Sequence, residues 1–330
     1  MARPPVVEAC GARRPQAAAR PQDAAVSAVA RGADRQVHRV RRPRPVADLP
    51  DVFLGTQALA AGLLKASQLR GPHVQRVIRG VYRPTWVPHD HVLACRAAAL
   101  VVPPGTRLTG RSLATVRGVP LAGARDPVEV VVPHGVELRH AGIAVRRASR
   151  GPLGDQRWEG ILVAHPHRMA FDLCARHDTA TATAHLDAVV RAGLVDADRF
   201  AAWLLQRRDD DVRAARRASL LVDGRAESLP ESRLRVVLVT AGIDVEVQHR
   251  VTRDGRTVAR LDLAVRGLRL GIDYDGAWHA LREQLQRDRQ RLNDLQAEGW
   301  VVVHVTAAML RDPASVVAAV RQAMLIARPL

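Results

Sequence analysis

Two stretches in the last third of the chain, 258–265 (VARLDLAV) and 268–275 (LRLGIDYD), decide the fold expected there. Both alternate apolar and other residues with a period of two, which predicts two neighbouring strands. The alternation places Asp262 opposite to the leucines that flank it, and it places Asp273 and Asp275 together on one face. Carboxylates are rarely buried unless they are paired or bound to a cation. Acids at these positions therefore indicate a shared site.

Helical patterns flank the two strands. The segment 231–242 (ESRLRVVLVTAG) carries an apolar stripe with helical spacing, and Glu231 falls on that stripe. A second helix is expected from His279 to about residue 298, and the strand-like run 299–305 (GWVVVHV) follows it. The predicted C-terminal domain is therefore a helix, strands, a second helix and a last strand.

The order of these residues resembles a known nuclease superfamily. Glu231 on a helix, Asp262 on a strand and the run 273–279 (DYDGAWH) resemble the PD-(D/E)xK nucleases. More specifically, they resemble the very-short-patch-repair-like (Vsr-like) domain of unknown function, to which 287–293 (RDRQRLN) and 299–305 (GWVVVHV) are also similar. The resemblance implies a restriction-endonuclease-like αβββαβ domain that acts on phosphodiester bonds.

That resemblance also implies a cation and a set of site residues. Phosphodiester hydrolysis needs a hard cation that neutralises phosphoryl charge and lowers the pKa of a water molecule. The implied ion is Mg²⁺ or Mn²⁺, held by Asp262, Asp273 and Glu231, because such ions prefer carboxylate oxygens. The implied catalytic residues are Glu231, Gln248, Asp262, Asp273, Asp275 and His279.

Other roles stay open for several charged residues. Arg289 and Arg291 are expected to contact phosphate, or to pair with Asp288. Glu231 also fits a helix N-terminal acid favoured by the helix dipole. Asp275 precedes a glycine and also fits a simple turn. Each of these alternatives explains one acid, whereas the metal site explains several acids in one order.

Two departures from the superfamily pattern predict weak cleavage. The pattern ends in a lysine, but Asp275 stands at that position, and the only lysine of the chain is Lys65, in another domain. The Vsr-like relatives mostly carry glutamate where this chain has Asp273. The shorter side chain withdraws the carboxylate by about one bond length, and a displacement of about 1 Å can cost roughly 10²-fold in rate.

The segment 50–86 has the pattern of a winged helix: a short helix that Thr56 is expected to cap, a second helix and a basic strand. The runs 57–62 (QALAAG) and 79–82 (RGVY) resemble the winged helix of the type IV abortive-infection antitoxin family. The resemblance implies contacts with double-stranded DNA. A winged helix that contacts only protein is the alternative. The implied nucleic-acid contacts are Lys65, Gln68, Arg70, Arg76, Arg79 and Arg83.

Composition favours an anionic partner. The 330 residues carry a formal net charge of +17, which indicates nucleic acid first and a membrane surface second. The three cysteines, Cys10, Cys95 and Cys174, have neither zinc spacing nor the pattern of a disulfide framework, which is typical of a cytoplasmic protein. No stretch reaches the 18 apolar residues of a membrane span, so no membrane partner is expected.

The sequence thus predicts a multidomain protein of the α+β or α/β class with two candidate functions. One is a DNA-binding, metal-dependent endonuclease of weak activity with a role in defence. The other is an antitoxin-like DNA-binding regulator with a retired nuclease scaffold and a protein partner. The predicted parts are a disordered basic tail (1–49), a winged helix-turn-helix (50–86), a mixed α/β linking domain (87–225) and a Vsr-like domain (226–330).

Overall fold

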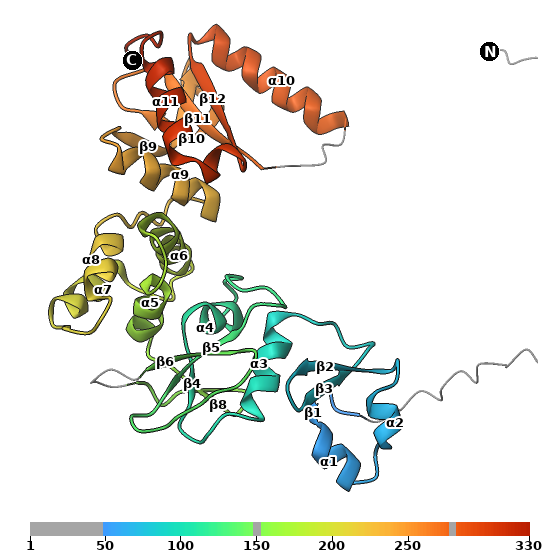
Figure 1. Cartoon of the computed structure of the whole chain (residues 1–330). Coiled ribbons are helices and arrows are strands. Elements are labelled where there is room, and N and C mark those ends of the chain that lie inside the picture. The colour runs from blue at the N-terminus through green and yellow to red at the C-terminus, as the bar shows by residue number, and fades with distance from the viewer. Residues whose placement is uncertain (1–48, 148–152, 277–281) are drawn as a thin grey trace, which may run out of the picture. The chain divides into compact units, whose positions relative to one another are not determined.

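The computed structural model describes residues 49–147, 153–276 and 282–330. These residues form a mixed α+β structure with helices packed on three β-sheets (Figure 1). By their contacts, the residues from Pro45 to Leu330 make up one compact unit. The predicted basic tail, apart from Leu49, and His279 lie outside the described residues. None of the described helices is long and apolar enough to cross a membrane.

The two helices expected in the first part of the chain are present, but the expected basic strand is a hairpin of two strands, and a further strand precedes the helices. The elements are β1 (Phe53–Leu54), α1 (Gly55–Ala60), α2 (Ala66–Leu69), β2 (Val74–Ile78) and β3 (Val81–Pro84). The strands are antiparallel in the order β1-β3-β2. The N-cap of α1 is Leu54 and not Thr56 as predicted, so the helix begins two residues earlier, at Gly55. Glycine is required there, because a Cβ on Gly55 would lie 2.7 Å from the Tyr82 ring.

The second sheet lies in the middle of the chain. Its strands are β4 (Arg107–Leu108), β5 (Val128–Val132), β6 (Ile143–Arg147), β7 (Arg157–Trp158) and β8 (Ile161–Val163). Its helices are α3 (His91–Ala99), α4 (Gly110–Val116), α5 (Pro166–Cys174), α6 (Thr179–Arg191), α7 (Ala197–Leu205) and α8 (Val212–Ser219). The strand order is β6-β5-β4-β8-β7, in which β5 pairs with β6, and β4 with β8, in parallel.

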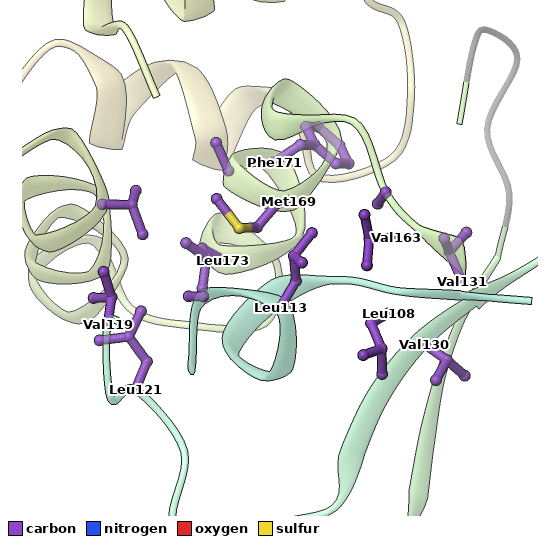
Figure 2. Close-up of a cluster of buried hydrophobic side chains, with 14 of the residues drawn as sticks. Leu108, Leu113, Val119, Leu121, Val130, Val131, Val163, Met169, Phe171 and Leu173 are labelled. Carbon is purple, nitrogen blue, oxygen red and sulfur yellow. The ribbon is translucent and has the colours of Figure 1, made fainter. Parts of the chain in front are cut away.

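The middle sheet packs its apolar face on α4 and α5. Figure 2 shows Leu108 and Val130 from the sheet beside Leu113 of α4 and Leu173 of α5. These side chains are buried, and each such burial stabilises the fold by roughly 1.5–3 kcal/mol. The side chains of this core come from elements throughout residues 78 to 218, so the core packs these elements together.

Helices α5 and α6 are separated by a short break. The backbone between α5 and α6 turns at Arg176, whose φ of 64° lies in the left-handed region. Asp178 then caps α6, accepting a hydrogen bond from the Thr181 N–H at 2.9 Å. The sequence does not indicate this break, because residues 168–191 contain neither proline nor glycine.

The C-terminal elements follow the predicted order and add one helix. They are α9 (Leu229–Thr240), β9 (Val245–Arg253), β10 (Arg256–Val265), β11 (Leu270–Asp275), α10 (Arg282–Ala297), β12 (Val301–Thr306), the 3₁₀ turn η1 (Met309–Arg311) and α11 (Pro313–Met324). The strand order is β12-β11-β10-β9. The three consecutive strands pair antiparallel, and β12 pairs parallel to β11 after the crossover through α10.

The alternation predicted for β10 fails at Asp262. Leu261 joins a cluster with Leu295 and Trp300, whereas Leu263 joins the cluster that includes Leu234 of α9. The two flanking leucines therefore do not share one core. This irregularity lies beside Gln248 of the neighbouring strand β9. Gln248 faces Asp262 and has a left-handed backbone.

Candidate functional site

The sheet brings Asp262 and Asp273 together. The antiparallel register pairs Leu263 with Ile272, so one step along each strand Asp262 faces Asp273. Asp273 accepts a hydrogen bond from the Asp262 N–H at 3.0 Å through Oδ1. Asp262 in turn accepts one from the Tyr274 N–H at 2.9 Å through Oδ2. Each carboxylate is thus held by the backbone of the other strand.

The two aspartates lie in a region poor in solvent. Only 6% of Asp273 is exposed. The pKa of Asp262 is raised to about 6, first by burial and then by the negative charges of Glu231 and Asp273. The hydrogen bond from Tyr274 and the positive charge of Arg291 oppose that rise but do not cancel it. Asp262 is therefore mainly ionised only above about pH 6, where a bound cation would stabilise its charge.

Glu231 reaches this region from the first turn of α9. Its N–H donates to the Ser228 hydroxyl at 3.3 Å, so Ser228 caps the helix. Its carboxylate oxygen Oε2 accepts hydrogen bonds from the Glu227 N–H and from Gln248 Nε2, both at 3.0 Å. The helix-terminal role and the site role of Glu231 are therefore compatible. Ser228 and Glu231 form the S-x-x-E signature of a helix start, a signal that was available in the sequence.

Gln248 has two unusual features. Its φ is 55°, in a region that non-glycine residues rarely occupy. Its side-chain oxygen Oε1 is buried and has no hydrogen-bond partner among the described residues. A strained backbone and an unpartnered buried oxygen beside Glu231 are features that occur at functional sites.

Arg291 is placed differently from the sequence expectation. Its guanidinium donates to Asp273 Oδ2 at 2.7 Å and to the Arg260 carbonyl at 2.6 Å. The sequence had suggested phosphate or Asp288 as its partner, and the side chain of Asp288 lies outside the described residues. An arginine thus already supplies a positive charge to the more buried of the two aspartates.

The remaining C-terminal residues are less involved. Asp275 ends β11 and is exposed, and Arg289 of α10 is exposed as well. Within the described part of the chain, no hydrogen bond joins either side chain to Asp262, Asp273 or Glu231. His279 lies outside it.

The donor types suit a hard divalent cation, but the geometry is not that of a ready-made site. Among the described residues, no three His, Cys, Asp or Glu side chains converge closely enough to hold a metal ion. Both oxygens of Asp273 are engaged, one by the Asp262 N–H and one by Arg291. A cation that binds Asp273 Oδ2 would therefore share that oxygen with Arg291 or displace it.

The basic residues of the N-terminal sheet form a mostly exposed surface. Lys65, Arg70, Arg76 and Arg79 are exposed. Gln68 is exposed too, but its oxygen Oε1 accepts a hydrogen bond from the Lys65 N–H at 2.9 Å, so it caps the short helix α2. This arrangement leaves the cationic side chains available to an anionic partner.

Arg83 does not belong to that surface. Only 8% of it is exposed. Its guanidinium donates to the carbonyls of Pro84 and Thr85 at 3.0 and 3.2 Å, and also to the Val87 carbonyl and the Gln75 side chain. The expectation that Arg83 contacts phosphate is wrong, because the side chain is buried and both terminal nitrogens donate within the protein.

No protein-family model matches the chain. The uncharacterized proteins MT2308 and Rv2248, from the CDC 1551 / Oshkosh and H37Rv strains of Mycobacterium tuberculosis, are each 31% identical to it over 159 residues. The match covers 47% of this chain and 59% of each relative, so the chain spans about three-fifths of their length. The crystal structure of the RV2827C protein of M. tuberculosis shares 19% identity over 62% of this chain and 80% of that one, with a TM-score of 0.36.

Proposed function

We propose that the protein binds double-stranded DNA through its N-terminal helices and wing, and that its C-terminal domain is a metal-dependent endonuclease of low activity. The observation that supports this most is the facing pair of Asp262 and Asp273, with Glu231 near enough to raise the pKa of Asp262. Acids buried for structural reasons normally face a cationic partner. Asp262 has a backbone amide as its hydrogen-bond partner and two like charges nearby.

Each residue has a role in this proposal. Asp262 and Asp273 would hold Mg²⁺ or Mn²⁺, with Glu231 as a further oxygen donor. The bound ion would neutralise phosphoryl charge and acidify a water molecule. Gln248 positions Glu231 through the hydrogen bond from its Nε2. Arg291 balances the charge of Asp273 until the ion arrives.

Further groups would contact the substrate. Arg289, which is exposed on the same helix as Arg291, would bind a phosphate of the nucleic acid. His279 would transfer a proton, and Asp275 would line the edge of the site.

A DNA-binding regulator without catalysis is the second candidate. Two observations favour it: Arg291 already pairs with Asp273, and the C-terminal domain contains no lysine. In that case, the aspartates serve to join β10, β11 and α10, and the chain would act by occupying DNA and by contacting a protein partner.

Nicking of supercoiled plasmid DNA separates the two candidates. We expect slow nicking that requires Mg²⁺ or Mn²⁺ and that is lost in Asp262→Asn. Asp273→Glu should raise the rate, because the longer side chain restores the reach of the carboxylate. Arg291→Gln should strengthen binding of Mn²⁺ in calorimetry, since it releases Asp273 Oδ2.

Asp244→Asn is the matched control for nicking. It makes the same chemical change at an exposed acid of the same domain, paired with Arg266 at 3.1 Å, and it should leave nicking unchanged. If calorimetry detects no Mg²⁺ or Mn²⁺ in the wild type or in Arg291→Gln, the non-catalytic function replaces the endonuclease.

DNA binding should depend on salt and on the wing. Neutralisation of Z phosphates makes log K fall with log salt at a slope of about −0.9Z. The double variant Arg76→Ala/Arg79→Ala should therefore reduce the slope by roughly 2 and weaken binding to DNA of any sequence. Arg199→Ala/Arg217→Ala, which removes two exposed arginines elsewhere, should change neither quantity. Equal effects of the two double variants would exclude the wing as the contact surface.

A further inference from the structure

A separate cavity lies in the middle part of the chain, away from the residues proposed for DNA binding and cleavage. Its volume is about 510 Å³, within the range of roughly 300–1,000 Å³ typical of small-molecule sites. Strand β6, helix α5 and the segment between α7 and α8 form its walls. Its charged lining residues are Arg146, Arg168, Arg176, Arg208, Asp172, Asp209, Asp210 and Asp211. We call it the arginine cavity.

The base of the arginine cavity is an ordered ion pair. Arg168 donates to Asp172 through Nε and a terminal nitrogen, each at 2.9 Å, and both side chains are buried. The Thr109 hydroxyl also donates to Asp172, at 2.6 Å. The charge of Asp172 is therefore balanced by Arg168, and the other three arginines of the lining are not needed to neutralise it.

Three arginines of the lining have no acidic partner among the described residues. Arg146, Arg176 and Arg208 form no ion pair with any described residue. The Nε atom of Arg146 is buried and has no hydrogen-bond partner among the described residues. A buried donor of this kind costs about 1–3 kcal/mol if nothing accepts from it. Arg176 is exposed and also lines the cavity.

The segment between α7 and α8 also brings acids to the cavity, next to Arg208. Asp209 is fixed by Arg207, which donates to it at 2.6 and 3.0 Å and lies over the Trp203 ring at 4.7 Å. Asp210 and Asp211 are exposed and form no ion pair within the described residues. These acids would repel the successive phosphates of a nucleic acid. A small molecule can place a single phosphate on the arginines and turn its hydroxyl or amino donors to the aspartates.

We propose that the arginine cavity binds a small phosphorylated metabolite, up to the size of a mononucleotide. The phosphate lies on Arg146, Arg176 and Arg208, where guanidinium groups offer paired donors to phosphate oxygens. Hydroxyl or amino groups of the ligand donate to Asp210 and Asp211.

Titration calorimetry on the full chain tests the proposal. The probes are adenosine 5′-monophosphate and ribose 5-phosphate, with adenosine and ribose as their phosphate-free counterparts, at physiological ionic strength. We expect one phosphorylated probe of the two, or both, to bind with one-to-one stoichiometry, and neither phosphate-free compound to bind. A preference between the two distinguishes a nucleotide from a sugar phosphate as the source of the phosphate group.

The variants locate the binding site. Arg176→Gln should weaken binding by about tenfold or more, as expected for loss of a charge-assisted contact. Arg208→Gln, in an exposed connecting segment, should do the same if Arg176→Gln fails to fold. Arg199→Gln makes the same change at an exposed position of α7 that lies outside the cavity. It should leave the affinity within about twofold.

Three results would overturn the proposal. They are the absence of binding by both phosphorylated probes, an equal loss of affinity in Arg199→Gln, and displacement of the bound probe by a duplex oligonucleotide. The last result would assign the arginines to the surface that binds nucleic acid.

Discussion

Asp262 is held in a position that disfavours its ionised form. Burial and the charges of Glu231 and Asp273 raise its pKa from 3.8 to about 6. A carboxyl whose folded-state pKa is raised stabilises the fold below about pH 4, where it is protonated, and that contribution is lost as the pH rises through about 6. The full shift corresponds to roughly 3 kcal/mol, reduced in practice by the part of the side chain that reaches solvent.

We therefore expect Asp262→Asn to stabilise the protein at pH 7.5, by about 1–3 kcal/mol, and to have little effect near pH 4. The amide oxygen can still accept from the Tyr274 N–H, so the hydrogen bond is kept. Urea unfolding at both pH values measures the difference. In addition, Mg²⁺ should stabilise the wild type at pH 7.5 but not the variant. A gain that is equal at the two pH values would contradict the assignment to Asp262.

At the scale of elements, helix α9 connects the candidate site to the middle part of the chain. Arg235, one turn beyond Glu231, donates to Asp187 of α6 at 2.9 Å and to the Leu221 carbonyl at 2.6 Å. Asp187 also accepts from the Asp223 N–H at 2.7 Å. Arg235 and Asp187 are both buried, so the orientation of α9 depends on a charge pair that water does not screen.

Removal of one partner should therefore be costly. Asp187→Asn leaves the Arg235 charge buried and unbalanced, and should lower the free energy of unfolding by roughly 3–5 kcal/mol. The double variant Asp187→Asn/Arg235→Met should lose less than Asp187→Asn alone, because no buried charge remains. Asp244→Asn breaks an exposed pair and should cost less than about 1 kcal/mol. Additive losses in urea unfolding would show that the two residues are not coupled.

The whole molecule has a net charge of +17. Nearly all of its positive charge comes from arginine, because the chain has a single lysine. The arginines serve distinct purposes. Arg83 and Arg235 are buried and hold the fold together. Arg76, on strand β2, and Arg79, in the turn after it, are exposed. Net charge alone therefore overstates the surface offered to an anionic partner. The two cysteines in the described residues, Cys95 and Cys174, are buried, and burial raises the pKa of each thiol to about 12, so both stay as unreactive thiols.

The sequence by itself determined the order and kind of the elements. The alternation in 258–265 and 268–275 predicted strands β10 and β11, and the apolar stripe of 231–242 predicted α9. It also placed Asp262 and Asp273 on adjacent strands. These results follow from side-chain periods of two and 3.6 residues, which are local properties that a sequence displays directly.

Only the tertiary structure decided which charges meet. Arg291 pairs with Asp273 across a helix and a strand, Arg83 turns inward to main-chain carbonyls, and the arginine cavity draws on three separate elements. The long guanidinium side chains can reach several partners at similar local cost, so their partners depend on how the elements pack. Packing is set by contacts between residues far apart in the chain, and no local period records them.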